Sequence, residues 1–281
     1  MVIAERRLGV DLGGTKIEAA VLDPAGTELF RKRVATPQGD YGGTLEAIVQ
    51  LVASAERECG TASSIGIGTP GALRADGTIK NANSVVLNGK PLKTDLERAL
   101  GRTVAMTNDA NCFILSEAFD GAARGARVAF GVILGTGVGG GIAAGGSILE
   151  GANAIAGEWG HNPLPWPTKE ESPGDPCYCG KWGCIETFLS GPALARLRES
   201  GVADPLAVYA DRLARALSSI VNILDPDVIV VGGGVSNIDA LYGSVPLLLS
   251  DYIFSDTIAT RLTKAMHGDS SGVRGAALLS G

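Results

Sequence analysis

Apolar and polar positions in the first half of the chain follow a strand-rich order. "RLGVDLGG" and "TKIEAAVLD" alternate around a tight glycine turn, which predicts two antiparallel strands, and "GTELFRKRVAT" supplies a third. "GGTLEAIVQLVASAEREC" has the spacing of a helix with one apolar face. "SIGIGTPG" and "TVAMTNDA" are short buried strands that end in polar residues, and we expect a helix after each. The first half is therefore predicted to be β-β-β-α-β-α-β-α.

The same pattern restarts at Val128. "FGVILGTGVGGGIAAGGSILEG" repeats the order of apolar run, glycine turn, apolar run and second turn found in "LGVDLGGTKIEAAVLDPAGTEL". A long helix, "DPLAVYADRLARALSSIVNILDP", then precedes the strand "DVIVVGGGVS". Two similar α/β halves that face each other would form a cleft lined by glycine turns. We expect an N-terminal lobe of residues 1–108, joined by a last helix at about 269–281, a C-terminal lobe of residues 109–268, and a hinge near Asn108 to Asn111.

Length and composition narrow the class of protein. The 281 residues, 45% apolar, are enough for one large domain or two lobes. The start lacks a signal-peptide pattern and no run of eighteen apolar residues occurs, so we expect a cytoplasmic protein that does not bind membranes. A net charge of -6 without basic clusters argues against nucleic acid. Five cysteines argue against a disulfide framework, and Cys59 and Cys112 are expected as small buried hydrophobes.

Glycines are clustered after apolar runs, at Gly13 and Gly14, within 135–141, and at 232–234. Glycine lets backbone N–H groups approach a phosphate, so these turns predict a nucleotide site, although "DLGGTK" could also be an ordinary hairpin turn. No G-x-x-x-x-G-K-[ST] occurs. The G-x-G-x-x-G match in 135–140 is followed by a strand pattern instead of a helix, which argues against a nicotinamide cofactor.

The loop of residues 157–186 carries metal-ligand and carboxylate side chains together. Cys177, Cys179 and Cys184 with His161 satisfy the tetrahedral preference of zinc, and four protein ligands predict a structural site. The alternative is a loop with unrelated cysteines. A histidine that binds metal through one ring nitrogen can offer the other to a carboxylate, a carbonyl or a bound hydroxyl. Such a loop could direct its carboxylates and His161 at a polyhydroxylated ligand; the residues concerned are Glu158, His161 and Glu186. The alternative for both glutamates is a solvated loop position.

The stretch "TNDAN", Thr107 to Asn111, stands at the end of a predicted strand, where α/β folds place their chemistry. Asp109 could accept a proton from an attacking hydroxyl, with Asn108 holding the acceptor. Either side chain could instead cap the following helix, and the two roles can coexist.

Together, "DLGGTK", "TNDAN", "LGTGVGGG", "EWGH" and "CYCGKWGCIE" resemble, in this order and over nearly the whole chain, a bacterial ROK (repressor, open reading frame, kinase) family sugar kinase. "EWGHNPLPW" with "PCYCGKWGCIETFLSG" is most similar to the fructokinase, or manno(fructo)kinase, branch. The resemblance implies a two-lobed actin/hexokinase-like ATPase fold of duplicated ribonuclease H-like domains. It also implies a homodimer that uses ATP and magnesium to phosphorylate fructose at its 6-hydroxyl.

The resemblance also implies roles for individual residues. Asp109 would be the general base that deprotonates the sugar hydroxyl, and Asp11 would orient hydrated magnesium. Phosphate turns are implied at Gly13, Gly14, Thr15 and Lys16 and at Thr136 and Gly137, with Gly233 and Gly234 against the adenosine. The implied sugar contacts are Asn83, Asn108, Asp109, Glu158, His161 and Glu186, so that His161 would serve both sugar and zinc.

Other functions remain open at this point. Within the family these are a glucokinase or an N-acetylhexosamine kinase, because hexoses differ by single hydroxyl orientations. Outside it they are a non-catalytic sugar-binding regulatory protein and a heat-shock-type or cell-shape ATPase. Repressors of the family carry a helix-turn-helix ahead of the sugar domain, and with the phosphate turn at residue 11 we expect none here. The short stretch after Leu249 leaves the last helices and the dimer surface open.

Overall fold

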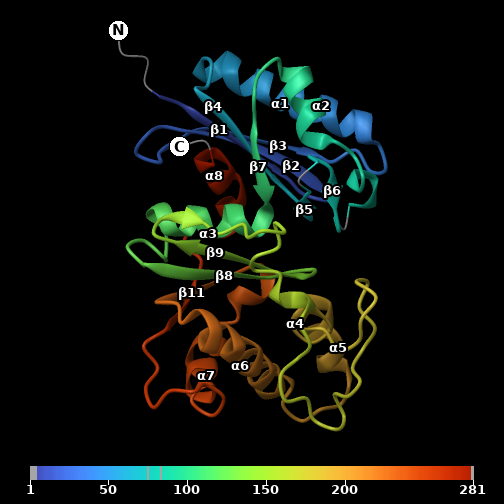
Figure 1. Ribbon diagram of the computed structural model, residues 1–281, viewed down its shortest axis with the longest axis vertical. Helices are drawn as coiled ribbons and strands as arrows, with labels where there is room; N and C mark the ends of the chain where they lie inside the picture. Colours follow the sequence, from blue (N-terminus) through green and yellow to red (C-terminus); the bar gives the residue numbers. More distant parts are fainter. Residues whose placement is uncertain (1–4, 75, 83, 280–281) are drawn as a thin grey trace. The chain divides into compact units, whose positions relative to one another are not determined.

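The computed structural model describes residues 5–74, 76–82 and 84–279, which form two α/β units (Figure 1). Unit 1 comprises Met1–Ser116, Glu150–Ile155 and Ser270–Gly281, and unit 2 comprises Glu117–Leu149 and Ala156–Asp269. The chain thus passes between the units four times. Each unit is described by itself below.

Unit 1 contains a mixed five-stranded sheet in the order β3-β2-β1-β4-β7. The first three strands are antiparallel and joined by short turns, whereas β4 and β7 run parallel to β1. The strands are β1 (Arg7–Leu12), β2 (Lys16–Leu22), β3 (Glu28–Ala35), β4 (Ser64–Thr69) and β7 (Ala105–Asn108). The helices are α1 (Tyr41–Cys59), α2 (Leu92–Leu100), α3 (Asp109–Asp120), which continues into unit 2, and α8 (Ser271–Leu278). The predicted element order is confirmed, except that a hairpin of β5 (Ala72–Leu73) and β6 (Ile79–Lys80) and a 3-10 turn, η1 (Val85–Leu87), precede α2.

Strand β1 shows how alternation builds unit 1. Leu8, Val10 and Leu12 point to the core beneath α1 and α2, whereas Gly9 faces α8 on the opposite face of the sheet (Figure 1). A Cβ on Gly9 would lie 2.2 Å from the carbonyl oxygen of Val273. The last helix therefore packs directly on the backbone of the sheet.

Unit 2 repeats the topology of unit 1, with the strand order β10-β9-β8-β11-β12 and the same sequence of antiparallel and parallel pairs. Its strands are β8 (Val128–Leu134), β9 (Val138–Ala144), β10 (Ser147–Ile148), β11 (Val228–Gly232) and β12 (Arg261–Lys264). Its helices are α4 (Ile185–Leu189), α5 (Gly191–Glu199), α6 (Pro205–Leu224) and α7 (Ala240–Leu249), with 3-10 turns η2 (Trp159–His161), η3 (Gly234–Asn237) and η4 (Gly268–Ser270). The restart predicted at Val128 is confirmed, and the strand expected after the turn at 135–137 is β9.

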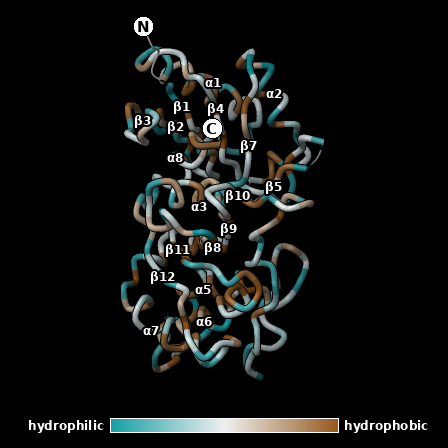
Figure 2. Tube along the Cα trace, turned by 60° about the vertical axis from the view of Figure 1, so that its left-hand side comes forward, coloured by the Kyte–Doolittle hydropathy of each residue, from teal (hydrophilic) through white to brown (hydrophobic). Residues whose placement is uncertain are grey.

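Hydrophobic positions gather along the central strands of both units (Figure 2). Unit 2 has its own core, in which Phe130 and Ile229 of the sheet pack with Tyr209, Leu213 and other apolar residues. No helix within residues 5–74, 76–82 and 84–279 is both long and apolar enough to cross a lipid bilayer.

Candidate active site and metal centre

The first glycine turn joins β1 to β2 in unit 1. The N–H of Gly13 donates to the carbonyl of Lys16 at 2.9 Å, and a Cβ on Gly13 would lie 2.9 Å from that same oxygen. Thr36 Oγ1 holds the turn from the next strand by donating to the Gly13 carbonyl at 2.8 Å. "DLGGTK" is therefore a hairpin turn, as one of its two interpretations expected, and its phosphate role stays a prediction.

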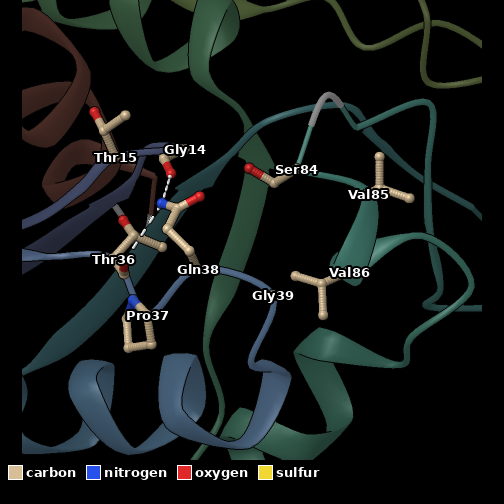
Figure 3. Close-up of a pocket in the computed structure, with 9 residues that line it drawn as sticks. All are labelled: Gly14, Thr15, Thr36, Pro37, Gln38, Gly39, Ser84, Val85 and Val86. Atoms are coloured by element: carbon tan, nitrogen blue, oxygen red, sulfur yellow. Dashed lines mark hydrogen bonds between the residues drawn. The ribbon is translucent and has the colours of Figure 1, made fainter.

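A cavity of about 390 Å³ opens beside this turn (Figure 3). Gly14 and Thr15 form one side, Gln38 donates its side-chain N–H to the Gly14 carbonyl, and Ser84 and Val85 lie opposite. The turn thus borders open space large enough for a small ligand. Asn83, an implied sugar contact, lies outside the described residues.

The carboxyl of Asp11 lies at the end of β1 in a crowded and acidic environment. Burial raises its pKa to about 7, helped by the negative charges of Asp109 and Glu18, while Lys16 and Arg33 oppose the shift. Gly272 leaves room for the carboxylate, because a Cβ there would lie 2.8 Å from an Asp11 oxygen. A hard cation would relieve the repulsion between these carboxylates, so the donor set fits the predicted magnesium.

Asn108 and Asp109 lie where β7 ends and α3 begins. The Asn108 Oδ1 accepts the N–H of Asn111 at 2.8 Å, and Asp109 Oδ1 accepts the N–H of Ala110 at 2.8 Å. The capping interpretation is therefore confirmed for Asn108. The influence of Asp109 on the pKa of Asp11 places the two carboxyls in one electrostatic environment.

A second cavity of unit 1, of about 500 Å³, is lined by Asn108 and Asn111, by Arg74 and Lys80 of the hairpin, and by residues 150–154. Lys80 Nζ donates to the carbonyl of Asn153 at 3.0 Å and so holds this returning segment in place. Asn111 Oδ1 is a buried acceptor without a partner among the described residues. The sequence analysis gave no role to the segment 150–154, because its position depends on distant partners.

The second glycine turn joins β8 to β9 in unit 2. Gly191 N–H donates to the Gly135 carbonyl at 2.7 Å, and a cavity of about 530 Å³ brings Thr136 together with Gly234. Gly233 has a φ of 81°, and a Cβ there would lie 2.4 Å from the Leu134 carbonyl oxygen. The structure thus brings together residues implied for phosphate and for adenosine.

Glu186 lies in the first turn of α4 and against the same glycine turn. Its Oε2 accepts the N–H of Val138 at 2.9 Å, and a Cβ on Gly137 would lie 2.6 Å from that oxygen. Glu186 is therefore partly held by the backbone, which orients its carboxylate. The sequence analysis predicted the carboxylate but not this partner.

The four predicted zinc ligands, His161, Cys177, Cys179 and Cys184, are gathered in unit 2. Their ligand atoms all lie within 4.8 Å of one another. Cys177 Sγ is 3.5 Å from His161 Nδ1, and Cys179 Sγ is 3.6 Å from Cys184 Sγ. A tetrahedral zinc with ordinary bond lengths would separate these atoms by about 3.5 to 3.8 Å. Gly180 and Gly183, with φ of 87° and 67°, form the tight turns between the ligands. The residues therefore fit a structural zinc.

Tyr178 lies between two of these cysteines and contacts the free side of the histidine ring. Its hydroxyl is 3.1 Å from His161 Nε2, and the two rings meet edge to face with centroids 5.2 Å apart. Partial loss of solvation, followed by the negative charges of Glu186 and Glu158, raises the pKa of Tyr178 to about 12. One implied sugar contact of unit 2, His161, thus contacts the phenol, and the charges of the other two act on it. Tyr178 was not predicted as a site residue, because its only signal in the sequence is its place in "CYC".

The metal loop is anchored to α6 by a buried ion pair. Glu171 accepts hydrogen bonds from Arg215 at 2.8 and 3.0 Å and from Arg212 at 2.7 Å. Burial alone would raise the pKa of Glu171, but the bonds from Arg215, the Thr168 N–H and Arg212 lower it to about 2. This anchor was also missed, since it joins residues 44 positions apart.

Comparison with known proteins places the chain in a family. The ROK family pattern matches residues 7–203 and 195–281. An N-acetyl-D-glucosamine kinase of Yersinia pseudotuberculosis serotype O:1b is 41% identical over 296 aligned positions, covering 96% of this chain and 97% of the relative. One from Pectobacterium atrosepticum is 40% identical with the same coverage.

Two solved structures share the fold over 98% of this chain. The ROK hexokinase from Thermus thermophilus has a TM-score of 0.84 at 33% identity, with 97% of that chain covered. A ROK family glucokinase from Streptomyces griseus, in complex with glucose and AMPPNP, has a TM-score of 0.80 at 28% identity, with 98% of that chain covered.

The Yersinia and Pectobacterium relatives are not fructokinases, so the fructokinase branch suggested by the zinc-loop motifs is not supported. With its two α/β units, its glycine turns and its His-Cys₃ cluster, the chain belongs to the ROK family.

Proposed function

We propose that the protein is an ATP-dependent kinase of N-acetyl-D-glucosamine that transfers the γ-phosphoryl group of ATP to the sugar 6-hydroxyl. Full-length relatives at 41% identity support this sugar, in place of the fructose expected from the motifs. A hexokinase of broader specificity is the second candidate, favoured by the 33% identity to the Thermus enzyme. Location in the cytoplasm and assembly as a homodimer stay predictions.

The observation that carries the proposal is the pair of carboxyls at the carboxyl ends of β1 and β7. Asp109 would accept the proton of the sugar hydroxyl as its oxygen attacks, and base catalysis of this kind contributes roughly 10² to 10⁴-fold. Asp11 would hold the hydrated magnesium, which neutralises charge on the transferring phosphoryl group. Asn108, held by its cap, would keep the neighbouring backbone rigid.

The remaining roles are positioning roles. In unit 1 the turn of Gly13, Gly14, Thr15 and Lys16 would contact phosphate. In unit 2 Thr136 and Gly137 would contact phosphate, and Gly233 and Gly234 would lie against adenosine. Hydrogen bonds with sugar hydroxyls would be formed by Glu158, His161 and Glu186, and also by Asn83 and Asn108. Zinc would hold the loop in shape without taking part in the chemistry.

Release of ADP, measured in a coupled assay, tests the proposal directly. The panel should contain N-acetylglucosamine, N-acetylmannosamine, glucose, mannose and fructose at matched concentrations. We expect kcat/KM for N-acetylglucosamine to exceed that for fructose by at least about tenfold, because a site built for an amide loses buried hydrogen bonds with other sugars. A preference for fructose would contradict the substrate, and sugar binding without turnover would favour the regulatory protein.

The matched variants are Asp109→Asn and the exposed Asp251→Asn. Asp109→Asn should lower kcat by roughly 10² to 10⁴-fold with ATP binding retained, because the amide cannot accept the proton. Asp251→Asn should leave turnover within about twofold, since surface changes away from a site have small effects. Near-normal turnover of Asp109→Asn would remove this residue from the role of base.

A further inference from the structure

The two ring nitrogens of His161 face different neighbours. Nδ1 faces the metal cluster, 3.5 Å from Cys177 Sγ, and Nε2 faces the Tyr178 hydroxyl at 3.1 Å. A histidine that binds zinc through Nδ1 carries its proton on Nε2 and donates it. The phenol oxygen of Tyr178 is then the acceptor of this hydrogen bond.

The phenol therefore lies where a sugar hydroxyl would be bound if His161 contacts the substrate. Glu158 and Glu186 are the other two implied sugar contacts of unit 2, and Glu158 directly precedes the η2 turn that carries His161. Glu186 is held in turn by the N–H of Val138 at 2.9 Å. The Tyr178 hydroxyl thus occupies a hydrogen-bonding position on a histidine that is itself an implied sugar contact.

Tyr178 is nevertheless poorly anchored. The residue is 67% exposed, and its ring meets that of His161 edge to face. Rotation of the side chain into water would therefore cost little beyond the hydrogen bond to Nε2. Buried tyrosines such as Tyr209, with 0% exposure, have no such freedom.

We propose that Tyr178 is a placeholder for substrate, whose hydroxyl occupies the hydrogen-bonding position on His161 Nε2 until a hydroxyl of the incoming sugar displaces it. The inference rests on the proposed function, since it takes a sugar as the occupant. The bond keeps His161 oriented before substrate binds. Its loss on binding lowers the apparent affinity, because only the fraction of molecules with Tyr178 displaced is competent to bind.

The test compares Tyr178→Phe with wild type and with Trp182→Phe, all zinc-loaded. Phenylalanine keeps the ring and removes only the hydroxyl, and Trp182 is an aromatic of the same loop that is 60% exposed. Zinc content and circular dichroism establish that each variant is folded. Calorimetric titration with N-acetylglucosamine gives Kd, and the coupled assay gives KM and kcat separately.

In Tyr178→Phe we expect Kd and KM for the sugar to fall together by about two- to tenfold, as removal of one competing hydrogen bond allows, with kcat within about twofold. The KM for ATP and all constants of Trp182→Phe should stay unchanged. An unchanged or weaker sugar affinity would show that Tyr178 is structural or is itself a sugar contact, and would overturn the proposal.

NMR spectra of the histidine rings give a second test of the proposal. The chain has two histidines, and His267 lies elsewhere in unit 2 in a 2.7 Å pair with Asp120. In ring-selective ¹H–¹⁵N spectra, the Nε2 signal of His161 should shift in Tyr178→Phe and on addition of sugar to wild type, while that of His267 stays in place. If wild type phosphorylates sugars but the His161 signal is indifferent to both changes, the placeholder alone is wrong. If wild type binds no sugar of the panel, the proposed function is wrong as well.

Discussion

Two aspartates of unit 1 have pKa values shifted in opposite directions, because their surroundings differ. Asp23 lies in the turn between β2 and β3, where N–H groups of Thr27 and Ala25 stabilise its charge and lower its pKa. Asp11, in the same unit, is half-buried near other carboxyls, and desolvation and their charges raise its pKa to about 7. The contrast identifies Asp11 as the residue whose charge is costly without a cation.

A dependence of stability on pH follows for Asp11. Because its folded pKa of about 7 lies above the unfolded value of 3.8, the folded state binds the extra proton, and stability falls as pH rises through that window. The melting temperature of Asp11→Asn minus that of wild type should therefore increase as pH rises from 5 to 8, in buffer free of magnesium and nucleotide. Asp23→Asn, the control, should differ from wild type by a constant amount over this range. A constant difference for Asp11→Asn would contradict the raised pKa.

Between elements, the closest contacts are made by glycine. A Cβ on Gly66 of β4 would lie 1.8 Å from the Ala276 carbonyl oxygen, and one on Gly275 of α8 would lie 1.7 Å from that of Cys112 in α3. The glycines let α8 approach β4 and α3 at backbone distance. Asp109 begins α3, and Gly272 of α8 lies against the Asp11 carboxylate, so the packing of α8 and the candidate site share contacts.

Alanine at position 275 is the sharpest test of this packing. Gly275→Ala should destabilise the protein by at least about 3 kcal/mol in urea titrations, because the added methyl meets rigid backbone. Gly243→Ala in α7, where a Cβ meets nothing within 4 Å, should be neutral or stabilising by up to about 1 kcal/mol through helix propensity. Equal stability changes in the two variants would show that α8 can shift without loss.

On the scale of the whole molecule, each of the two units has a large hydrophobic core among its described residues. One surrounds β1 and β4 in unit 1, and the other surrounds β8, β11 and α6 in unit 2. The His-Cys₃ cluster and the Glu171 anchor to α6 both belong to unit 2. Metal binding should therefore stabilise one unit more than the other.

Removal of metal tests this division. Freshly purified, reduced protein should contain about one equivalent of zinc, and a chelator should accelerate hydrogen exchange in residues 157–190 and α6 while β1 and β4 keep their protection. Cys179→Ser should reproduce this change, whereas Cys59→Ser, in α1 of unit 1, should leave zinc content unchanged. Metal-free protein, or equal loss of protection in both units, would be evidence against a structural zinc in unit 2.

Much of the fold and of the candidate chemistry was readable from the sequence. The alternation in β1 and β2, the restart at Val128 and the spacing of Cys177, Cys179 and Cys184 are local, because periodicity and short-range ligand spacing depend only on neighbouring residues. Asn108 and Asp109 were likewise found from their place at the end of a strand. The finer assignment to fructose was not supported, since a few loop residues separate one hexose from another.

Other features depend on residues that are far apart in the chain and meet only after folding. Residues 150–154 reach Lys80, Glu171 reaches Arg215, and Tyr178 reaches His161 through contacts that no local pattern encodes. The raised pKa of Asp11 has the same origin, because burial and the charge of Asp109 arise from chain packing. Local order thus follows from residue type and period, whereas hydrogen-bond partners, burial and electrostatic environment are long-range consequences of the packed chain.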